Sequence, residues 1–273
     1  MPQGAAGGEA RVTRLSGTRH RTLKLTISYD GTRFVGWQRQ AAGVSIQGLL
    51  EDALARFEGA PVSVHGAGRT DAGVHALGQV ASVRMTSAHA PEVIARGVNA
   101  RLPADVRVVD IQEVAADFHA RFSARSKTYR YWLRTSAIVS PFERAYVWHV
   151  PEALDIDAMR VASRALVGTH DFAAFQSTGT DVTETVRTIF ESAIGERAAS
   201  GWQDPAAPLL AYEVTGSGFL RHMVRAVVGT LVEVGRGRRP ATSISSLLAG
   251  GSRSEAGITA PPQGLFLVRV VYD

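Results

Sequence analysis

The segment 66–79, GAGRTDAGVHALGQ, contains the residues best placed for chemistry in this sequence. Asp71 follows Arg69 by two positions, and the glycines at 66, 68 and 73 let the backbone approach a ligand closely. In a nearly extended segment, residues two apart point the same way, so Arg69 and Asp71 can share one face. A nearby guanidinium favours the ionised carboxylate. Asp71 is therefore the candidate for acid–base or nucleophilic chemistry; the alternative is an aspartate that caps its own turn and pairs with Arg69.

Other kinds of catalytic site find less support in the sequence. There is no cysteine, which excludes disulfides and thiolate chemistry. No Ser, His and Asp set has a recognisable spacing, and no His and Glu cluster has the spacing of metal ligands. No second carboxylate lies in a comparable motif, so a glycosidase with paired acids is not indicated.

Composition predicts a globular protein with a polyanionic partner. A chain of 273 residues with 45% hydrophobic content can form one large domain or two ordinary ones. We expect no membrane span and no secretory signal, and the absence of cysteine favours the cytoplasm. The net charge is +5, and only Lys24 and Lys127 are lysines. Arginine binds phosphate bidentately and stacks on bases, which favours RNA, although a GC-rich genome explains the same ratio.

Hydrophobic periodicity indicates which elements position Asp71. Ser45 can cap a helix, and Pro91 can open another. The predicted order is strand 23–29, helix 46–57, strand 62–64, strand 79–85, helix 91–98 and strand 106–114. This β-α-β-β-α-β order is that of the ferredoxin-like unit, an antiparallel sheet with both helices on one face.

The same order recurs in the second part of the chain. The predicted elements are strand 127–134, helix 157–167, strands 186–193 and 208–215, helix 219–234 and strand 265–272. We therefore predict an α+β fold of two ferredoxin-like halves, 22–117 and 118–273, after a flexible arm at 1–21. Joined edge to edge, the halves would form one long antiparallel sheet with a central RNA-binding cleft. The loop 198–207 carries no interpretable motif.

Four further segments combine aromatic, basic and glycine residues where a simple core would not need them. They are 29–40 (YDGTRFVGWQRQ), 118–131 (FHARFSARSKTYRY), 218–229 (GFLRHMVRAVVG) and 264–267 (GLFL). Together with 66–79 they resemble the tRNA pseudouridine synthase A (TruA) family, from about residue 22 to residue 273. The run 68–75 is the most specific part of the resemblance.

The resemblance implies a role for each matching position. Asp71 would be the catalytic aspartate, Arg69 its partner in the loop and Arg225 the basic residue that pairs with it. Tyr129 would pack against the target base, and Leu265 would form an apolar wall. The resemblance also implies a homodimer without metal or other cofactor, which isomerises uridine at positions 38, 39 and 40 of the tRNA anticodon arm.

The reaction suits these residue types. Isomerisation breaks the N1–C1′ bond and joins C1′ to C5 of the uracil, so positive charge develops on the sugar. A carboxylate can attack C1′ or take the 2′ proton, and the sequence leaves both routes open. The base must leave its stack, and Tyr129 can hold it. Arg221 and Arg225, four apart on one predicted helix, can contact Asp71 and a phosphate.

Two other functions remain as alternatives. One is a catalytically inert RNA-binding protein on the same sheet, for which the intact run 68–75 would have no use. The other is an enzyme that cleaves small glycosides, against which the missing second acid and the basic charge argue. Five histidines lack ligand spacing, and we expect them to make hydrogen bonds or to contact RNA: His65, His75, His119, His170 and His222.

Overall fold

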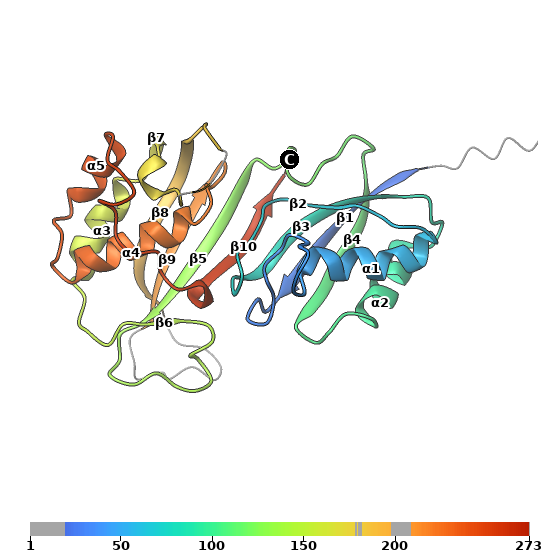
Figure 1. The fold of residues 1–273 in the computed structure, drawn as a ribbon, viewed down its shortest axis with the longest axis horizontal. Helices are drawn as coiled ribbons and strands as arrows, with labels where there is room; N and C mark the ends of the chain where they lie inside the picture. Colours follow the sequence, from blue (N-terminus) through green and yellow to red (C-terminus); the bar gives the residue numbers. More distant parts are fainter. Residues whose placement is uncertain (1–19, 178, 180–181, 198–208, 273) are drawn as a thin grey trace, which may run out of the picture.

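The computed structural model describes residues 20–177, 179, 182–197 and 209–272, which form an α+β fold around one ten-stranded sheet (Figure 1). The strand order is β4-β1-β3-β10-β5-β9-β8-β7, with β2 paired to β3 and β6 paired to β5. Of the pairs that the described residues form, β3 with β10 and β5 with β6 are parallel and the others are antiparallel. The predicted fold class is confirmed. Residues 1–19 of the predicted arm at 1–21 and the loop 198–207 lie outside the described residues, and the end of that arm is wrong, because Arg21 already belongs to the first strand.

The first part of the chain follows the predicted order. Its elements are β1 (Arg21–Tyr29), α1 (Ile46–Glu58), β2 (Val64–Gly66), β3 (His75–Met85), α2 (Pro91–Asn99) and β4 (Val106–Val114). Ser45 caps α1 as predicted, because its side chain accepts a hydrogen bond from the Gly48 backbone N–H at 3.2 Å. The strand predicted at 79–85 begins earlier, at His75, so β3 starts soon after Asp71.

The second part repeats that order with additional short elements. It contains β5 (Ser126–Arg134), β6 (Trp148–His149), α3 (Ile156–Arg164), β7 (Gly168–Asp171), η1 (Ala173–Phe175), β8 (Val186–Arg197), β9 (Leu209–Gly216), α4 (Met223–Gly235), α5 (Ser243–Leu248), η2 (Pro262–Gly264) and β10 (Leu265–Val271). The helix predicted from 219 begins at Met223, because His222 has a left-handed backbone with φ 62°. Arg221 therefore precedes the helix, and the prediction that it shares a helical face with Arg225 is wrong.

Both parts arrange four strands in the same order. If β1, β2, β3 and β4 are numbered one to four in the first part, and β5, β8, β9 and β10 in the second, the order across the sheet is four, one, three, two. That order is β4-β1-β3-β2 in one part and β10-β5-β9-β8 in the other. Figure 1 shows α1 and α2 over the first set of strands and α3, α4 and α5 over the second. The division between residues 117 and 118 remains a prediction.

The two sets of strands join through β3 and β10. Phe266 pairs with His75 and Leu267 with Ala76, in parallel. Further along the same edge of β3, β2 pairs with residues 81–83. This junction, called the seam below, places the start of β10 beside the start of β3, immediately after the segment that carries Asp71.

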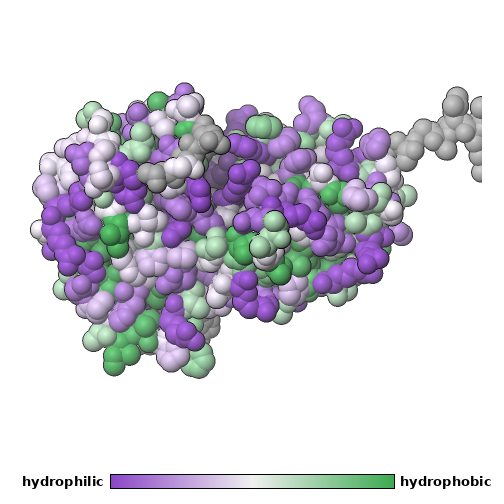
Figure 2. Space-filling model, in the orientation of Figure 1, coloured by the Kyte–Doolittle hydropathy of each residue, from purple (hydrophilic) through white to green (hydrophobic). Residues whose placement is uncertain are grey.

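The buried side chains form one main core that includes strands of both parts, for example Leu25 on β1 and Leu133 on β5. Figure 2 shows mostly hydrophilic residues on the face in view, with hydrophobic ones gathered at the lower left, over the segment near β6. In the part of the chain that the structure describes, no helix is long and apolar enough to cross a membrane.

Candidate active site

Asp71 lies in the segment that connects β2 to β3, and the residues beside it are held firmly. The Thr70 hydroxyl shares a hydrogen bond with the buried Tyr29 hydroxyl at 2.8 Å. The Thr70 carbonyl accepts from the Trp37 backbone N–H at 3.0 Å. Two residues before Thr70, the Gly68 carbonyl accepts from Gln79 Nε2 at 2.9 Å. The backbone on the N-terminal side of Asp71 is therefore fixed by β1, by β3 and by the 29–40 segment.

The 29–40 segment needs its glycine to reach this backbone. Gly36 has φ 105°, and a Cβ added there would lie 2.6 Å from the Thr70 carbonyl oxygen. Only glycine adopts such a backbone conformation without strain and permits such an approach. The aromatic and glycine residues that stood out in the sequence thus support the Asp71 segment.

The Asp71 carboxylate faces a cation from the second half of the chain. Arg225 Nη1 donates to Asp71 Oδ2 at 3.2 Å, and His222 Nε2 lies 3.4 Å from the same oxygen. The side chains of Asp71 and Arg225 are 28% and 13% exposed, so the pair is only partly screened by water. Since the carboxylate bonds to α4 and not to its own loop, the alternative of a turn-capping aspartate is not what the structure shows.

Arg225 is itself fixed by the chain that leads to β10. Its Nε donates to the Ala260 carbonyl at 2.7 Å, and its own carbonyl accepts from the Ala260 N–H at 3.0 Å. The guanidinium therefore presents Nη1 to Asp71 in one orientation. Burial lowers the pKa of His222, which leaves Arg225 as the positive partner of Asp71 at neutral pH.

Arg69 does not make the predicted pair with Asp71. Its side chain is exposed, and among the described residues it has no ion-pair partner. The segment is not extended beyond Asp71: the Asp71 carbonyl accepts from the Val74 N–H at 3.2 Å, and Gly73 has φ 77°. The carboxylate turns toward Arg225, and Arg69 stays in solvent.

Tyr129 lies on β5 close to this carboxylate. Burial raises the pKa of its hydroxyl, and Tyr29 and Asp71 nearby raise it further, so the group is neutral. Its ring packs edge-on against Phe219 at 5.0 Å between centroids. In the part of the chain that is described, no group hydrogen-bonds to its hydroxyl. Leu265 is buried at the start of β10, where it pairs with Tyr131, two positions along β5 from Tyr129.

His75 joins the elements around the seam. Its Nδ1 accepts from the Gly31 N–H at 3.0 Å, and its Nε2–H donates to the Gln263 carbonyl at 3.2 Å. Burial lowers the pKa of this imidazole, consistent with the neutral form that these two bonds require. The ring stacks on Phe266 at 4.5 Å. The expectation that His75 makes hydrogen bonds is confirmed.

The contact of His222 with Asp71 could not be read from the sequence. It depends on the left-handed backbone of His222, the one positive φ among the described non-glycine residues. Such conformations cost free energy and cluster at functional sites. Among the described residues, no cluster of three or more His, Cys, Asp or Glu side chains could hold a metal ion.

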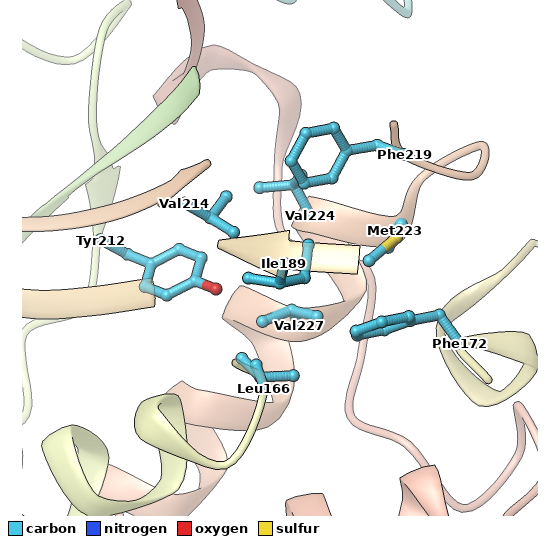
Figure 3. Close-up of a pocket in the computed structure, with 9 residues that line it drawn as sticks. All are labelled: Leu166, Phe172, Ile189, Tyr212, Val214, Phe219, Met223, Val224 and Val227. Carbon is cyan, nitrogen blue, oxygen red and sulfur yellow. The ribbon is translucent and has the colours of Figure 1, made fainter. Parts of the chain in front are cut away.

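A small cavity beneath the sheet is part of the core and not a substrate site (Figure 3). Its walls are apolar apart from the Tyr212 hydroxyl, which shares a hydrogen bond with Ser192 at 3.0 Å. The lining residues are Leu166, Phe172, Ile189, Tyr212, Val214, Phe219, Met223, Val224 and Val227. Nothing in it can act on a sugar.

Comparisons with known proteins cover both halves of the site. A family model described as tRNA pseudouridine synthase matches residues 25–123 and 162–273. A protein of Syntrophotalea carbinolica named tRNA pseudouridine synthase A is 48% identical over 250 residues, 92% of this chain and 96% of that protein. Proteins of the same name from Myxococcus xanthus and Geobacillus are 47% and 45% identical, over 92% of this chain and 91% and 98% of theirs.

Proposed function

This chain belongs to the tRNA pseudouridine synthase family, and on that basis we propose that it isomerises uridine to pseudouridine in tRNA with Asp71 as its catalytic group. The observation that carries the assignment of Asp71 is its position. Its carboxylate is partly buried, held by Arg225 from the other half of the chain and close to Tyr129. A site assembled from both halves in this way suits a reaction on one nucleotide lifted out of an RNA.

The proposed reaction has three steps. The target uridine leaves its stack and its base packs against the Tyr129 ring, with Leu265 as an apolar wall. Asp71 attacks C1′ or takes the 2′ proton; in either route the N1–C1′ electron pair passes to the uracil, and the carboxylate compensates the charge on the sugar. The uracil turns and C5 bonds to C1′; this breaks the Asp71–C1′ ester in the first route, and in the second route Asp71 returns its proton to C2′. The C5 proton is then lost and N1 gains a proton.

The cations have separate roles in this proposal. Arg225 orients the Asp71 carboxylate, because its guanidinium is fixed on the Ala260 carbonyl. Arg69 is exposed and free of ion pairs among the described residues, and we assign it to the bound RNA near the catalytic carboxylate. The resemblance further supports uridines 38, 39 and 40 of the anticodon arm as targets, a homodimer, and no metal or other cofactor. The absence of cysteine supports a cytoplasmic location. These remain proposals.

The test uses purified protein and an unmodified tRNA transcript, with pseudouridine mapped by position. We expect product from the wild type, none detectable from Asp71→Asn or Asp71→Ala, and tRNA affinity within a few-fold for all three. Asp157→Asn is a matched control, because it removes the same charge from an exposed position on α3. Substantial product from Asp71→Asn would refute the role of this carboxylate, and binding without product from the wild type would indicate an inert RNA-binding protein.

A further inference from the structure

A row of stacked rings lies beside the Asp71 segment and has no role in the chemistry proposed above. His65 on β2 stacks on His119 at 5.2 Å between centroids, with 30° between the planes. His119 in turn packs against Phe122 at 4.4 Å and 34°. Phe122 is 76% exposed. The row, called the ring stack below, begins on the strand that leads to Asp71 and ends with an open ring in solvent.

The loop that carries Phe122 is held in place by its backbone. The Ala120 N–H donates to Ser82 Oγ at 3.1 Å, and the Ala120 carbonyl accepts from the Tyr272 hydroxyl at 2.7 Å. Ala120 also packs with Ala67, four residues before Asp71. Single exposed hydrophobic residues are common on protein surfaces. Phe122, however, packs at 34° against His119, and the Arg121 guanidinium carbon lies over the Phe122 ring, 5.6 Å from its centroid. An exposed ring with a cation beside it, on an anchored loop, can take part in stacking with another flat ring.

Three cations, Arg121, Lys127 and Arg187, lie close enough for their charges to interact, and they have no carboxylate partners among the described residues. Lys127 on β5 reaches the Asp71 segment, since a Cβ added at Gly68 would lie 3.8 Å from its Cε. Burial, together with the charges of Arg121 and Arg187, lowers the pKa of Lys127. Among the described residues, no acidic side chain forms an ion pair with any of these three. This excess of positive charge suits a phosphate.

We propose that the ring stack and the cations Arg121 and Lys127 form a subsite for an unpaired nucleotide of tRNA adjacent to the target uridine. The base stacks on the exposed Phe122 ring, and the phosphate on its target side lies between Arg121 and Lys127. This inference rests on the proposed function. Aromatic rings combined with cations are the usual means of binding single-stranded RNA.

The spacing of residues along β5 indicates that this nucleotide is the neighbour of the target uridine. Lys127 and Tyr129 are two residues apart on one strand, so their side chains point to the same side, roughly 7 Å from each other. That distance is comparable with the length of one extended nucleotide. Burial, His65 and Arg121 lower the pKa of His119, and a neutral imidazole completes the ring stack without adding charge.

The main test compares Phe122→Ala, Phe122→Tyr and Phe142→Ala in the full chain. Phe142 is the matched control: it is 74% exposed but lies beyond the opposite end of β5. We expect Phe122→Ala to raise both the KM and the Kd for tRNA about 5- to 150-fold, the range for loss of one stacked base. The Kd is measured with Asp71→Asn added to each variant, which prevents turnover. Phe122→Tyr should stay within about two-fold of the wild type, as should Phe142→Ala.

The salt dependence of binding separates stacking from charge. Lys127→Gln should reduce the slope of log affinity against log salt by about 0.7 to 0.9, the amount for one phosphate contact. Phe122→Ala should weaken binding with the slope unchanged, because it removes no charge. If Phe122 had only a structural role, the two variants would not differ in this way, with Phe122→Ala changing the affinity alone and Lys127→Gln changing the salt slope.

The results that overturn the subsite differ from those that overturn the function. Wild-type affinity in Phe122→Ala, an equal loss in Phe142→Ala, or a lower melting temperature in Phe122→Ala than in Phe142→Ala each refutes the ring stack. An unchanged salt slope in Lys127→Gln refutes the phosphate contact. If the wild type converts tRNA uridine and Phe122→Ala behaves normally, the subsite alone fails; if the wild type makes no pseudouridine, the proposed function fails.

Discussion

Replacing Gly36 by alanine should slow the enzyme markedly without replacing a residue of the proposed chemistry. The new Cβ would lie 2.6 Å from the Thr70 carbonyl oxygen and 3.1 Å from the Asp71 carbonyl carbon. Both neighbours are backbone atoms, so no side chain can rotate out of the way. Relaxing the shorter contact to 3.0 Å requires a shift of about 0.4 Å, the difference between the two distances. The shift falls on the residue that precedes Asp71.

The expected size of the effect follows from two contributions. A residue other than glycine at φ 105° costs about 1–3 kcal/mol, and the forced contact adds about 1–3 kcal/mol. The free energy of unfolding should therefore fall by about 2–6 kcal/mol. A misplacement of about 1 Å can reduce catalysis about 100-fold. The smaller shift at Thr70 should lower kcat by about 10- to 100-fold.

Gly59→Ala is the matched control for this prediction. Gly59 ends α1 with φ 73°, and a Cβ there would meet nothing within 4 Å. It should lose about 1–2 kcal/mol from backbone strain alone and keep its kcat. Activity is measured as tritium released from tRNA labelled at uridine C5, since that hydrogen leaves when C5 bonds to C1′. If kcat of Gly36→Ala lay within about three-fold of Gly59→Ala, with both proteins folded, Gly36 would not position the catalytic segment.

Three further predictions follow from the contacts of the site. Tyr129→Phe should keep its stability in urea and most of its turnover, because no described residue hydrogen-bonds to the hydroxyl. Tyr129→Ala should lose about 3–5 kcal/mol of stability and at least five-fold in turnover. Equal turnover of the two variants would exclude stacking of the base on Tyr129. Arg225→Met should lower kcat about 10- to 100-fold and the free energy of unfolding by about 1–3 kcal/mol, because Asp71 and the Ala260 carbonyl lose a charged donor. A larger loss of stability with a normal kcat would show that Arg225 is a structural residue. Burial lowers the pKa values of His75 and His222, so below about pH 6.5 the folded protein binds fewer protons than the unfolded chain. The stability that these neutral histidines contribute is therefore fully present above that pH and is lost as the pH falls through their lowered pKa values. Urea unfolding at pH 7.5 and 5.5 should show this loss, and His75→Gln should reduce it.

The fold was largely predictable because its signals are local. Alternating and helical patterns located the main strands and helices of both halves, and Ser45 located the start of α1. The start of α4 was misplaced because Phe219 and Leu220 extend the apolar pattern backward from Met223. Their burial has another cause, since Phe219 packs on Tyr129. The short elements β6, β7 and α5 contain too few residues to show a period.

The site was predictable only in part, for a related reason. Asp71 stands out by its residue type and its glycine neighbours, which are properties of the sequence itself. The spacing allowed Arg69 and Asp71 to share a face, and the resemblance implied that they pair. In the structure Asp71 pairs with Arg225 instead, and the Arg69 side chain is exposed. The contact with His222 leaves no signal at all, since it joins two halves that only the folded sheet brings together.

The proposed chemistry depends on the seam, because neither half of the chain contains all the residues of the proposed site. Asp71 comes from the segment before β3, while Arg225 and Tyr129 come from α4 and β5. Direct strand pairing across the seam is short, from His75 and Ala76 to β10, and the His75 stack on Phe266 reinforces it. The Tyr146 hydroxyl also donates to Asp30 across the two halves at 2.8 Å. A change that loosens these contacts should therefore move the Asp71 carboxylate away from Arg225 and lower the activity.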